Sequence, residues 1–139
     1  MTAFPYQATC VAIGGRGVLI EGDSGTGKSS LALALIDRGA KLVGDDGLLL
    51  EARDGKLWAL PHPNIAGLLE IRNVGLATFP ATPAPIALVI RLDRDAERLP
   101  EEPEGVAIGG VKVPMIRLFP DSPFLHLRAE WALALHGAG

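Results

Sequence analysis

Residues 22–29 read Gly-Asp-Ser-Gly-Thr-Gly-Lys-Ser and match the pattern G-x-x-x-x-G-K-[S/T] at every fixed position. Such a segment suits a ligand with several negative oxygens, because its glycines let the backbone curl until successive N–H groups point inward. The Lys28 ammonium is a point charge for the β- and γ-phosphates, and the Ser29 hydroxyl is a ligand for Mg²⁺. The pattern therefore predicts a nucleoside triphosphate site made of Gly22, Asp23, Ser24, Gly25, Thr26, Gly27, Lys28 and Ser29.

The segments on either side of this motif predict the elements that would hold it. Residues 17–21 form a short apolar run, which is typical of a buried parallel strand. Residues 28–38 predict a helix with apolar residues at helical spacing, and Gly39 can end that helix. The positive N-terminal end of this helix would add to the anion site. A glycine-rich turn with an accidental Lys-Ser pair is the alternative, but strand, loop and helix in this order favour nucleotide binding.

Two adjacent carboxylates follow the next predicted strand, residues 40–44. Asp45 and Asp46 would then lie at the carboxyl edge of the sheet, where open α/β sheets bind their ligands. Phosphoryl transfer needs metal ligands and a group that orients or deprotonates the nucleophile. Two adjacent aspartates can divide this work, and Asp45 is our candidate metal ligand. An aspartate turn before Gly47 is the structural alternative.

Three further charged residues are candidates for the same site. Glu70 and Arg72 interrupt an otherwise apolar segment, so their charges need partners or a ligand. A structural ion pair and a role in the site explain them equally well. Arg98 follows the longest apolar run and lies in a polar segment, where a solvated surface position is the simplest interpretation. The three histidines show no metal-ligand spacing and do not predict a zinc site.

Two hairpins are predicted in the first half of the chain. One joins residues 8–13 to the strand before the phosphate-binding motif through a glycine-rich turn. The other has Asp54 and Gly55 between two apolar stretches, which is a strong hairpin signal. We expect residues 65–71 to form a short helix or a loop with apolar anchors.

The second half of the chain predicts a central strand, further strands and a helix. Residues 86–93 are apolar and rich in branched side chains, as in a strand buried on both faces. Residues 94–105 predict a solvated loop, and residues 106–118 one or two short strands. Ser122 is the expected N-cap of a helix over residues 124–136. The apolar stripe that we expect to pack on the sheet comprises Leu127, Trp131, Ala134 and Leu135.

Composition narrows the class of protein. The 139 residues predict one domain over residues 1–139, and 48% hydrophobic with 21% charged residues is typical of a globular protein. A net charge of −3 without a basic stripe argues against a nucleic-acid partner. We find neither a leader sequence nor an apolar run long enough to span a bilayer, and Cys10 is the single cysteine. We therefore expect a cytoplasmic protein without a membrane partner.

These residues together resemble the catalytic domain of HPr kinase/phosphorylase, in a short single-domain form. The resemblance covers about residues 8–117 and is carried by the stretches GVLIEGDSGTGKSS, LALALIDRGAKLVGDD and LLEIRNVG. The phosphate-binding motif alone is common to many proteins, whereas the aspartate pair at this distance and the LLEIR stretch are specific together. The resemblance implies an α/β fold, with a P-loop nucleotide-binding core like that of phosphoenolpyruvate carboxykinase, assembled as a homo-hexamer.

The resemblance also implies an activity. Members transfer a phosphoryl group from ATP to a serine of HPr, the phosphocarrier of the sugar phosphotransferase system, and can remove it with inorganic phosphate, which yields pyrophosphate. Lys28 and Ser29 match the family's phosphate and Mg²⁺ residues. Asp46 matches the aspartate that accepts the serine proton in one direction and returns it in the other. Glu70 matches a magnesium ligand, and Arg98 resembles the arginine that assists transfer.

The sequence departs from the family pattern at three places. Gln7 stands where members usually have a histidine, and Ser30 stands where they usually have an acidic residue after the loop serine. Residues 113–117 lack the glycine of a loop that the family links to dephosphorylation. These departures predict weak phosphorolysis. The alternatives to a kinase are a nucleotide-binding regulator, a phosphatase and an inactive scaffold. A GTPase is disfavoured because the chain has no N-K-x-D motif for reading guanine.

Overall fold

The central strands of the protein bring the phosphate-binding motif to one edge of a mixed sheet. The structure is a computed structural model and describes residues 2–139. Strand β3 (Arg16–Gly22) pairs antiparallel with β2 (Thr9–Ile13) and parallel with β9 (Ala84–Leu92). Strand β11 (Val111–Leu118) continues the parallel group on the other side of β9. The predicted hairpin before the motif and the predicted central strand are confirmed.

Strand β4 (Lys41–Gly44) runs in the same direction as β3, because both pair antiparallel with β2. The carboxyl ends of β3, β4, β9 and β11 therefore meet at one edge of the sheet. Helix α1 (Lys28–Asp37) begins directly after the phosphate-binding motif at this edge. It ends as predicted, because Gly39 adopts a φ of 108°, where a side chain would be strained.

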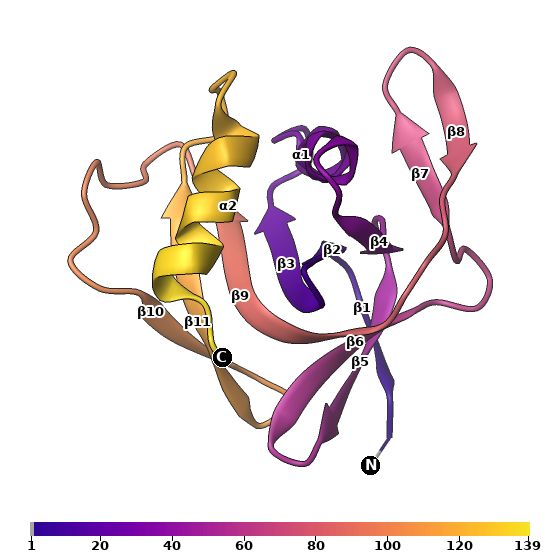
Figure 1. Cartoon of the computed structure of the whole chain (residues 1–139), viewed down its shortest axis with the longest axis horizontal. Helices are drawn as coiled ribbons and strands as arrows, with labels where there is room; N and C mark the ends of the chain where they lie inside the picture. The colour runs from indigo at the N-terminus through magenta and orange to yellow at the C-terminus, as the bar shows by residue number, and fades with distance from the viewer. Residues whose placement is uncertain (1) are drawn as a thin grey trace.

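Two hydrophobic cores cover the two faces of the central strands. On β3, Val18 and Ile20 pack in the core beneath α1 and α2 (Leu125–His136), whereas Leu19 lies in the core on the opposite face. This alternation is what a strand buried on both faces requires. Residues of both helices belong to the first core, and Figure 1 shows α2 over β9 and β11 and α1 next to the end of β3. Because both faces of the sheet are covered, side chains of the central strands can reach a ligand mainly at the strand ends.

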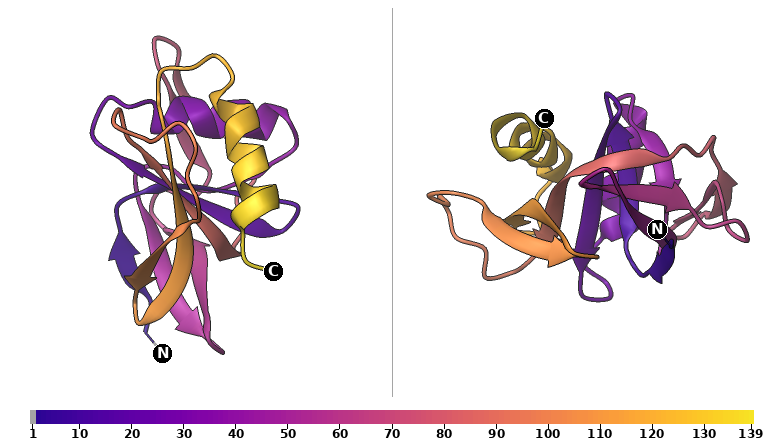
Figure 2. Two further views of the ribbon diagram at one scale, coloured as in Figure 1. Left: turned by 90° about the vertical axis from the view of Figure 1, so that its left-hand side faces the viewer. Right: turned by 90° about the horizontal axis from the view of Figure 1, so that it is seen from below.

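The opposite face is covered by hairpins. Strands β5 (Leu48–Arg53) and β6 (Lys56–Pro61) form the predicted hairpin, with positive φ values at Asp54 and Gly55. Strand β1 (Phe4–Tyr6) pairs with β5, and β10 (Glu104–Ile108) forms a hairpin with β11. The tips of these hairpins lie at the end of the molecule away from α1 (Figure 2). The overall class is mixed α/β, as the sequence predicts.

The segment after β6 differs from its expected structure. The sequence predicted a short helix or loop over residues 65–71, but β7 (Leu68–Ile71) pairs antiparallel with β8 (Gly75–Thr78) in a separate two-stranded sheet. Leu69 is buried while Glu70 is exposed, so alternate residues face opposite sides. Strand β7 contacts α1 instead of joining the large sheet.

The face of α2 that packs on the sheet also differs from the prediction. Its buried residues are Leu125, Ala129, Ala132 and Leu133. Trp131 and Leu135 of the predicted stripe are 66% and 69% exposed, and Ala134 is exposed too. Each residue of the predicted stripe lies two positions after a buried one. Two positions along a helix correspond to a rotation of about 200°, so the predicted stripe lies on nearly the opposite face of the helix. The small alanines allow α2 to lie close to β9 and β11, which explains why that face is buried.

The start of α2 is also later than expected. The sequence predicted Ser122 as the N-cap, but the N-cap is Phe124, which has no side-chain cap. The Ser122 hydroxyl instead accepts a hydrogen bond from the Phe124 N–H at 3.1 Å, in the turn before the helix. Neither helix in residues 2–139 has the length and apolar character that crossing a bilayer requires.

The packing of α2 predicts a contrast between two neighbouring leucines. Leu133 is 3% exposed in the core beneath the helix, so Leu133→Ala should lower the free energy of unfolding by about 2–5 kcal/mol. Leu135→Ala is the matched control, and it should change the free energy by less than about 0.5–1 kcal/mol because this side chain faces solvent. Urea unfolding followed by circular dichroism measures both. Equal losses would contradict the orientation of the helix.

Candidate active site

The phosphate-binding motif, or P-loop, connects the end of β3 to the start of α1. Gly25 and Gly27 have φ values of 82° and 93°, which L side chains rarely adopt. At Gly22, a Cβ would lie 2.8 Å from Thr26 Oγ1 and 3.1 Å from Leu92 Cβ, so the chain can leave the sheet here only with glycine. The Thr26 hydroxyl donates to the Asp23 carbonyl at 2.7 Å and closes the curl.

The Lys28 ammonium lies within the curl of the P-loop. Its Nζ donates to the carbonyl oxygens of Gly22 at 2.9 Å and Asp23 at 3.1 Å. An ammonium has three donors on a flexible stem, so it can exchange these carbonyls for the oxygens of an anion. The positive charge is therefore held at the place where the motif requires it.

Asp45 joins three elements at the carboxyl edge of the sheet. Its Oδ1 accepts hydrogen bonds from the Ser29 hydroxyl of α1 at 2.6 Å and from the Thr9 hydroxyl of β2 at 3.0 Å. Its Oδ2 accepts the backbone N–H of Glu70 on β7 at 3.3 Å. A carboxylate held against the P-loop serine has the arrangement of the two protein groups that hold Mg²⁺ in P-loop nucleotide hydrolases. The structure thus brings together Ser29 and Asp45 as the sequence analysis expects of a shared metal site.

Asp46 has an unusual backbone and an open side chain. Its φ of 59° is uncommon for a residue other than glycine, although aspartate tolerates it, and such positions gather at functional sites. Its carboxylate is exposed and accepts a long hydrogen bond of 3.5 Å from the Gln7 amide. An exposed carboxylate with one weak partner is free to accept a proton from a ligand.

Two clefts meet at the P-loop, and both are lined by Ser24, Lys28 and Asp46. The larger cleft has a volume of about 570 Å³ and extends toward the β7–β8 hairpin, and we name it the hairpin-side cleft. Glu70 and Arg72 line it together with Ser29 and Asp45. The expectation that these two charged residues could belong to the site therefore agrees with their position.

The second cleft, of about 480 Å³, holds residues that the sequence analysis missed. Tyr6, Glu21 and Arg91 line it together with the residues shared with the hairpin-side cleft, and we name it the arginine-side cleft. The Tyr6 hydroxyl donates a hydrogen bond to the Glu21 carboxylate. Burial first, and then this hydrogen bond, raise the pKa of Tyr6 to about 12. The one sequence signal was that Glu21 and Arg91 are charges at the ends of apolar strands.

Arg98 lies in the loop between β9 and β10, and it lines neither cleft. The loop begins at Asp93, which accepts hydrogen bonds from the Asp95 N–H at 2.8 Å and from Arg117 Nη1 at 3.0 Å. These two contacts lower the pKa of Asp93, so its carboxylate stays charged and fixes the start of the loop. The structure does not bring Arg98 together with Lys28, and the catalytic role of Arg98 stays a prediction.

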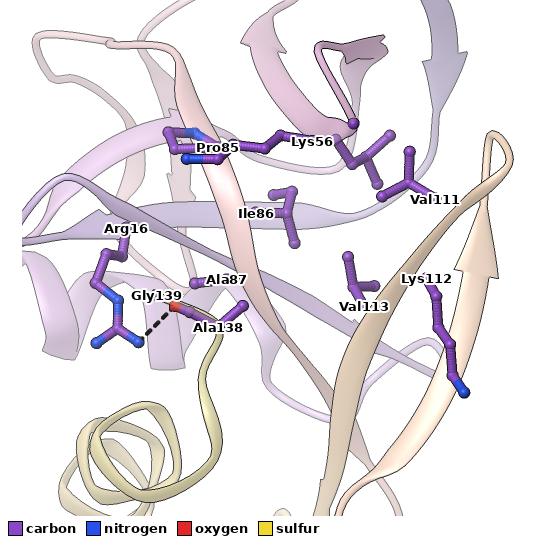
Figure 3. A pocket seen from close by; sticks show the side chains of 12 residues that line it. Arg16, Lys56, Pro85, Ile86, Ala87, Val111, Lys112, Val113, Ala138 and Gly139 are labelled. Atoms are coloured by element: carbon purple, nitrogen blue, oxygen red, sulfur yellow. Dashed lines mark hydrogen bonds between the residues drawn. The ribbon is translucent and has the colours of Figure 1, made fainter.

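A separate cavity of about 160 Å³ lies near the opposite ends of β3, β9 and β11. Figure 3 shows Ile86 and Val113 on its walls and the Arg16 guanidinium, which donates to the Ala138 carbonyl at 2.7 Å. No carboxylate side chain lines this cavity within residues 2–139. The clefts at the P-loop are therefore the better candidates for an active site.

Comparison with known proteins agrees with the site. The family model of the HPr serine kinase C-terminal domain matches residues 3–120 of the sequence. The chain belongs to this family. An HPr kinase/phosphorylase of Streptococcus thermophilus is 41% identical over 122 residues, covering 78% of this chain, and one of Streptococcus agalactiae is 39% identical over 118 residues, covering 75%. This chain spans about two fifths of the length of these relatives, 40% and 38%.

A solved structure shares the fold of this HPr kinase family member. The Hpr(Ser) kinase/phosphatase from Coxiella burnetii superposes with a TM-score of 0.82, at 28% identity, over 94% of each chain. The family resemblance seen in the sequence is thus confirmed, and so is the mixed α/β fold. The roles of the individual site residues are not tested by these comparisons and remain predictions.

The arginine-side cleft predicts an unusual tyrosine. Tyr6 is the only tyrosine in the chain, so ultraviolet absorbance of tyrosinate reports on it alone. In the folded protein the absorbance should rise with a midpoint near the pKa of about 12, and Glu21→Gln should lower that midpoint because the acceptor loses its charge. The folded state holds this proton more tightly than the unfolded chain does. The resulting stabilisation is therefore complete below about pH 10 and is lost as the pH rises through about 12.

A titration midpoint near 10 in the folded wild-type protein, unchanged in Glu21→Gln, would contradict this contact. Circular dichroism recorded at each pH shows whether the protein is still folded, and Tyr6→Phe gives the absorbance baseline.

Proposed function

We propose that residues 1–139 form the single catalytic domain of a protein-serine kinase that transfers the γ-phosphoryl group of ATP to HPr. The observation that carries this proposal is the hydrogen bond of 2.6 Å between Ser29 and Asp45, with Asp46 beside it at the border of both clefts. It supplies a metal-binding pair and an open carboxylate next to the P-loop, which are the parts that phosphoryl transfer needs. Membership of the HPr kinase family and the names of the relatives support HPr as the acceptor.

The residues of the P-loop fit a nucleotide. A Cβ at Gly25 or Gly27 would meet no atom within 4 Å, so the loop has open space beside its backbone for a bulky anion. We propose Gly22 to Ser29 as the binding segment for ATP, in a nucleotide-binding core like that of phosphoenolpyruvate carboxykinase. The triphosphate would be cradled by backbone N–H groups and by the Lys28 ammonium.

The ligand set fits Mg²⁺. Among residues 2–139 no cluster of three or more histidine, cysteine or acidic side chains is placed to hold a metal, and Mg²⁺ at a nucleotide is usually held by few protein groups together with phosphate oxygens and water. Ser29, Asp45 and Glu70 all offer oxygen atoms, which Mg²⁺ prefers, and all three line the hairpin-side cleft. When bound, Mg²⁺ would neutralise charge on the phosphates, and ATP would supply the phosphoryl group.

The mechanism assigns a separate task to each residue. Asp46 accepts the proton of the incoming serine hydroxyl, for which it is exposed and weakly partnered. Lys28 neutralises negative charge on the phosphates, while Asp45 holds the Ser29 hydroxyl in place for the metal. Positioning and charge neutralisation account for most of the catalysis in this scheme. Arg98 is kept as an assisting residue on the family resemblance alone.

The remaining parts of the proposal rest on the family. We propose a cytoplasmic enzyme that assembles as a homo-hexamer and has HPr as its protein substrate. In the reverse direction, inorganic phosphate attacks the phosphoserine of HPr, so that the serine hydroxyl and pyrophosphate are formed. A regulator that binds ATP without modifying HPr is the competing function, and the first experiment below separates the two.

Incubating the protein with purified HPr and ATP labelled at the γ-phosphate should give labelled serine in HPr. Asp46→Asn should lower the rate by at least about 10²-fold, because an amide cannot accept the serine proton, while ATP affinity measured by calorimetry is not weakened. Asp54→Asn is the matched control, since Asp54 also has a positive φ of 50° but lies at the tip of the β5–β6 hairpin. Near-normal turnover of Asp46→Asn would contradict the role of Asp46. ATP binding by the wild-type protein without labelled HPr would favour the regulator.

The reverse reaction should be slow in the wild-type protein. Gln7 donates to Asp46 at 3.5 Å, and its amide cannot exchange a proton as the imidazole usual in the family can. Serine-phosphorylated HPr incubated with inorganic phosphate should therefore release pyrophosphate slowly, and Gln7→His should release it faster. The kinase assay on the same variant is the control. Rapid pyrophosphate release by the wild-type protein would show that Gln7 is no handicap.

A further inference from the structure

The arginine-side cleft contains a guanidinium that no role assigned above uses. Arg91 follows Val89 and Ile90 on β9, at the end of a strand that is otherwise apolar. The parallel register places Arg91 directly beside Glu21 of β3, so the two side chains lie on the same face of the sheet. Their position at the carboxyl edge brings Arg91 into the same cleft as Lys28 and Asp46.

The guanidinium has unused hydrogen-bonding capacity. Its Nη1 is 3.7 Å from Glu21 Oε1 and its Nη2 is 4.0 Å from Asp23 Oδ1, which are ion-pair distances too long for hydrogen bonds. Within residues 2–139 the Arg91 side chain donates no hydrogen bond to any group. The side chain is 38% exposed, so its five N–H donors can reach a ligand in the cleft.

The surrounding groups hold Arg91 in the cleft without neutralising it completely. The Glu21 side chain is 17% exposed and accepts the Tyr6 hydroxyl, so it is fixed beneath the guanidinium. The Asp23 side chain is 93% exposed, and an ion pair of this kind contributes little and is easily exchanged. A dianion that replaces the Asp23 carboxylate would gain a planar donor suited to bidentate contact.

We propose that Arg91 binds oxygens of a phosphate group in the arginine-side cleft, on the side of Lys28 away from Ser29 and Asp45, with Glu21 and Tyr6 as positioning residues. The phosphate is either the terminal phosphate of ATP or a free inorganic phosphate, and both present the same oxygens. The proposal rests on ATP binding by the P-loop, as proposed above, and does not depend on HPr being the acceptor. It adds an arginine at the P-loop, where Arg98 does not lie.

Calorimetry tests this proposal without any phosphorylation assay. The dissociation constants of ATP, of ADP, and of inorganic phosphate in the presence of ADP are measured with Mg²⁺ for the wild-type protein, Arg91→Ala and Arg91→Lys. Loss of charge-assisted contacts in Arg91→Ala should weaken one of the phosphate-dependent steps about tenfold or more, while ADP binding is unchanged. A loss for ATP assigns the terminal phosphate, and a loss for inorganic phosphate assigns the free anion. Arg91→Lys should lose less, because it keeps the charge but not the fork.

Two controls separate direct contact from general electrostatics. Arg53→Ala removes a cation from the distant β5–β6 hairpin and should change none of the three constants. The second control is a double variant, Glu21→Gln with Arg91→Ala, which removes both charges of the ion pair. If Arg91 touches the phosphate, this double variant binds it as weakly as Arg91→Ala does. Recovery of wild-type affinity in the double variant, or unchanged constants in a folded Arg91→Ala, would overturn the proposal. Absence of ATP binding by the wild-type protein would instead overturn nucleotide binding itself.

Discussion

The site depends on one carboxylate, that of Asp45. It accepts hydrogen bonds from the Ser29 hydroxyl at 2.6 Å, the Thr9 hydroxyl at 3.0 Å and the Glu70 N–H at 3.3 Å. These donors belong to α1, β2 and the β7–β8 hairpin, three elements that otherwise share few polar contacts. Thr9 is 1% exposed, so without Asp45 its hydroxyl proton would lose its acceptor at a cost, although its oxygen also accepts the Asp46 N–H at 3.5 Å. One side chain therefore links the P-loop helix, the sheet edge and the hairpin that brings Glu70 to the cleft, in addition to their shared hydrophobic core.

The parallel pairing of β3 with β9 imposes a second constraint on the site. The two strands are in register up to Gly22 and Leu92, and Leu92 Cβ would lie 3.1 Å from a Cβ at position 22. The chain must therefore leave the sheet at a glycine and curl away from β9. This is why the P-loop opens at the carboxyl edge, and why Lys28 can reach back to the carbonyls of the same turn.

Most of the local structure follows from sequence because local signals decide it. The P-loop, the glycine after α1 and the Asp54-Gly55 turn each depend on a backbone conformation that few residues adopt. The β7 strand was missed, because four residues are too few for a periodic signal and its partner is the next short strand. The buried face of α2 was chosen wrongly since apolar residues line both sides of that helix, and Ala129 and Ala132 allow the closer approach.

The sequence likewise predicted some residues of the site and missed others. Ser29 and Asp45 were expected to share a metal because each follows an element with a clear pattern, and the structure places them in contact. The pairing of Arg91 with Glu21 could not be found from sequence, although both are charges at the ends of apolar strands, because the two residues are 70 positions apart and meet only through the register of β3 with β9. The Tyr6 side chain reaches Glu21 from β1, which β5, β6 and β9 separate from β3 in the order of the strands. Contacts made by tertiary pairing leave no local signal.

The strand ends determine which charged side chains line each of the two clefts. Glu21 continues the face of β3 that carries Leu19, which is opposite to the face covered by α1. Arg91 continues the same face of β9, so the cation and its acidic partner lie away from the helix, while Ser29 and Asp45 lie at the start of the helix. Lys28 and Asp46 border both clefts. Under the proposed function, a phosphate held by Lys28 would therefore have oxygen ligands for a cation on one side and a guanidinium on the other, and the carboxylate of Asp46 borders both sides.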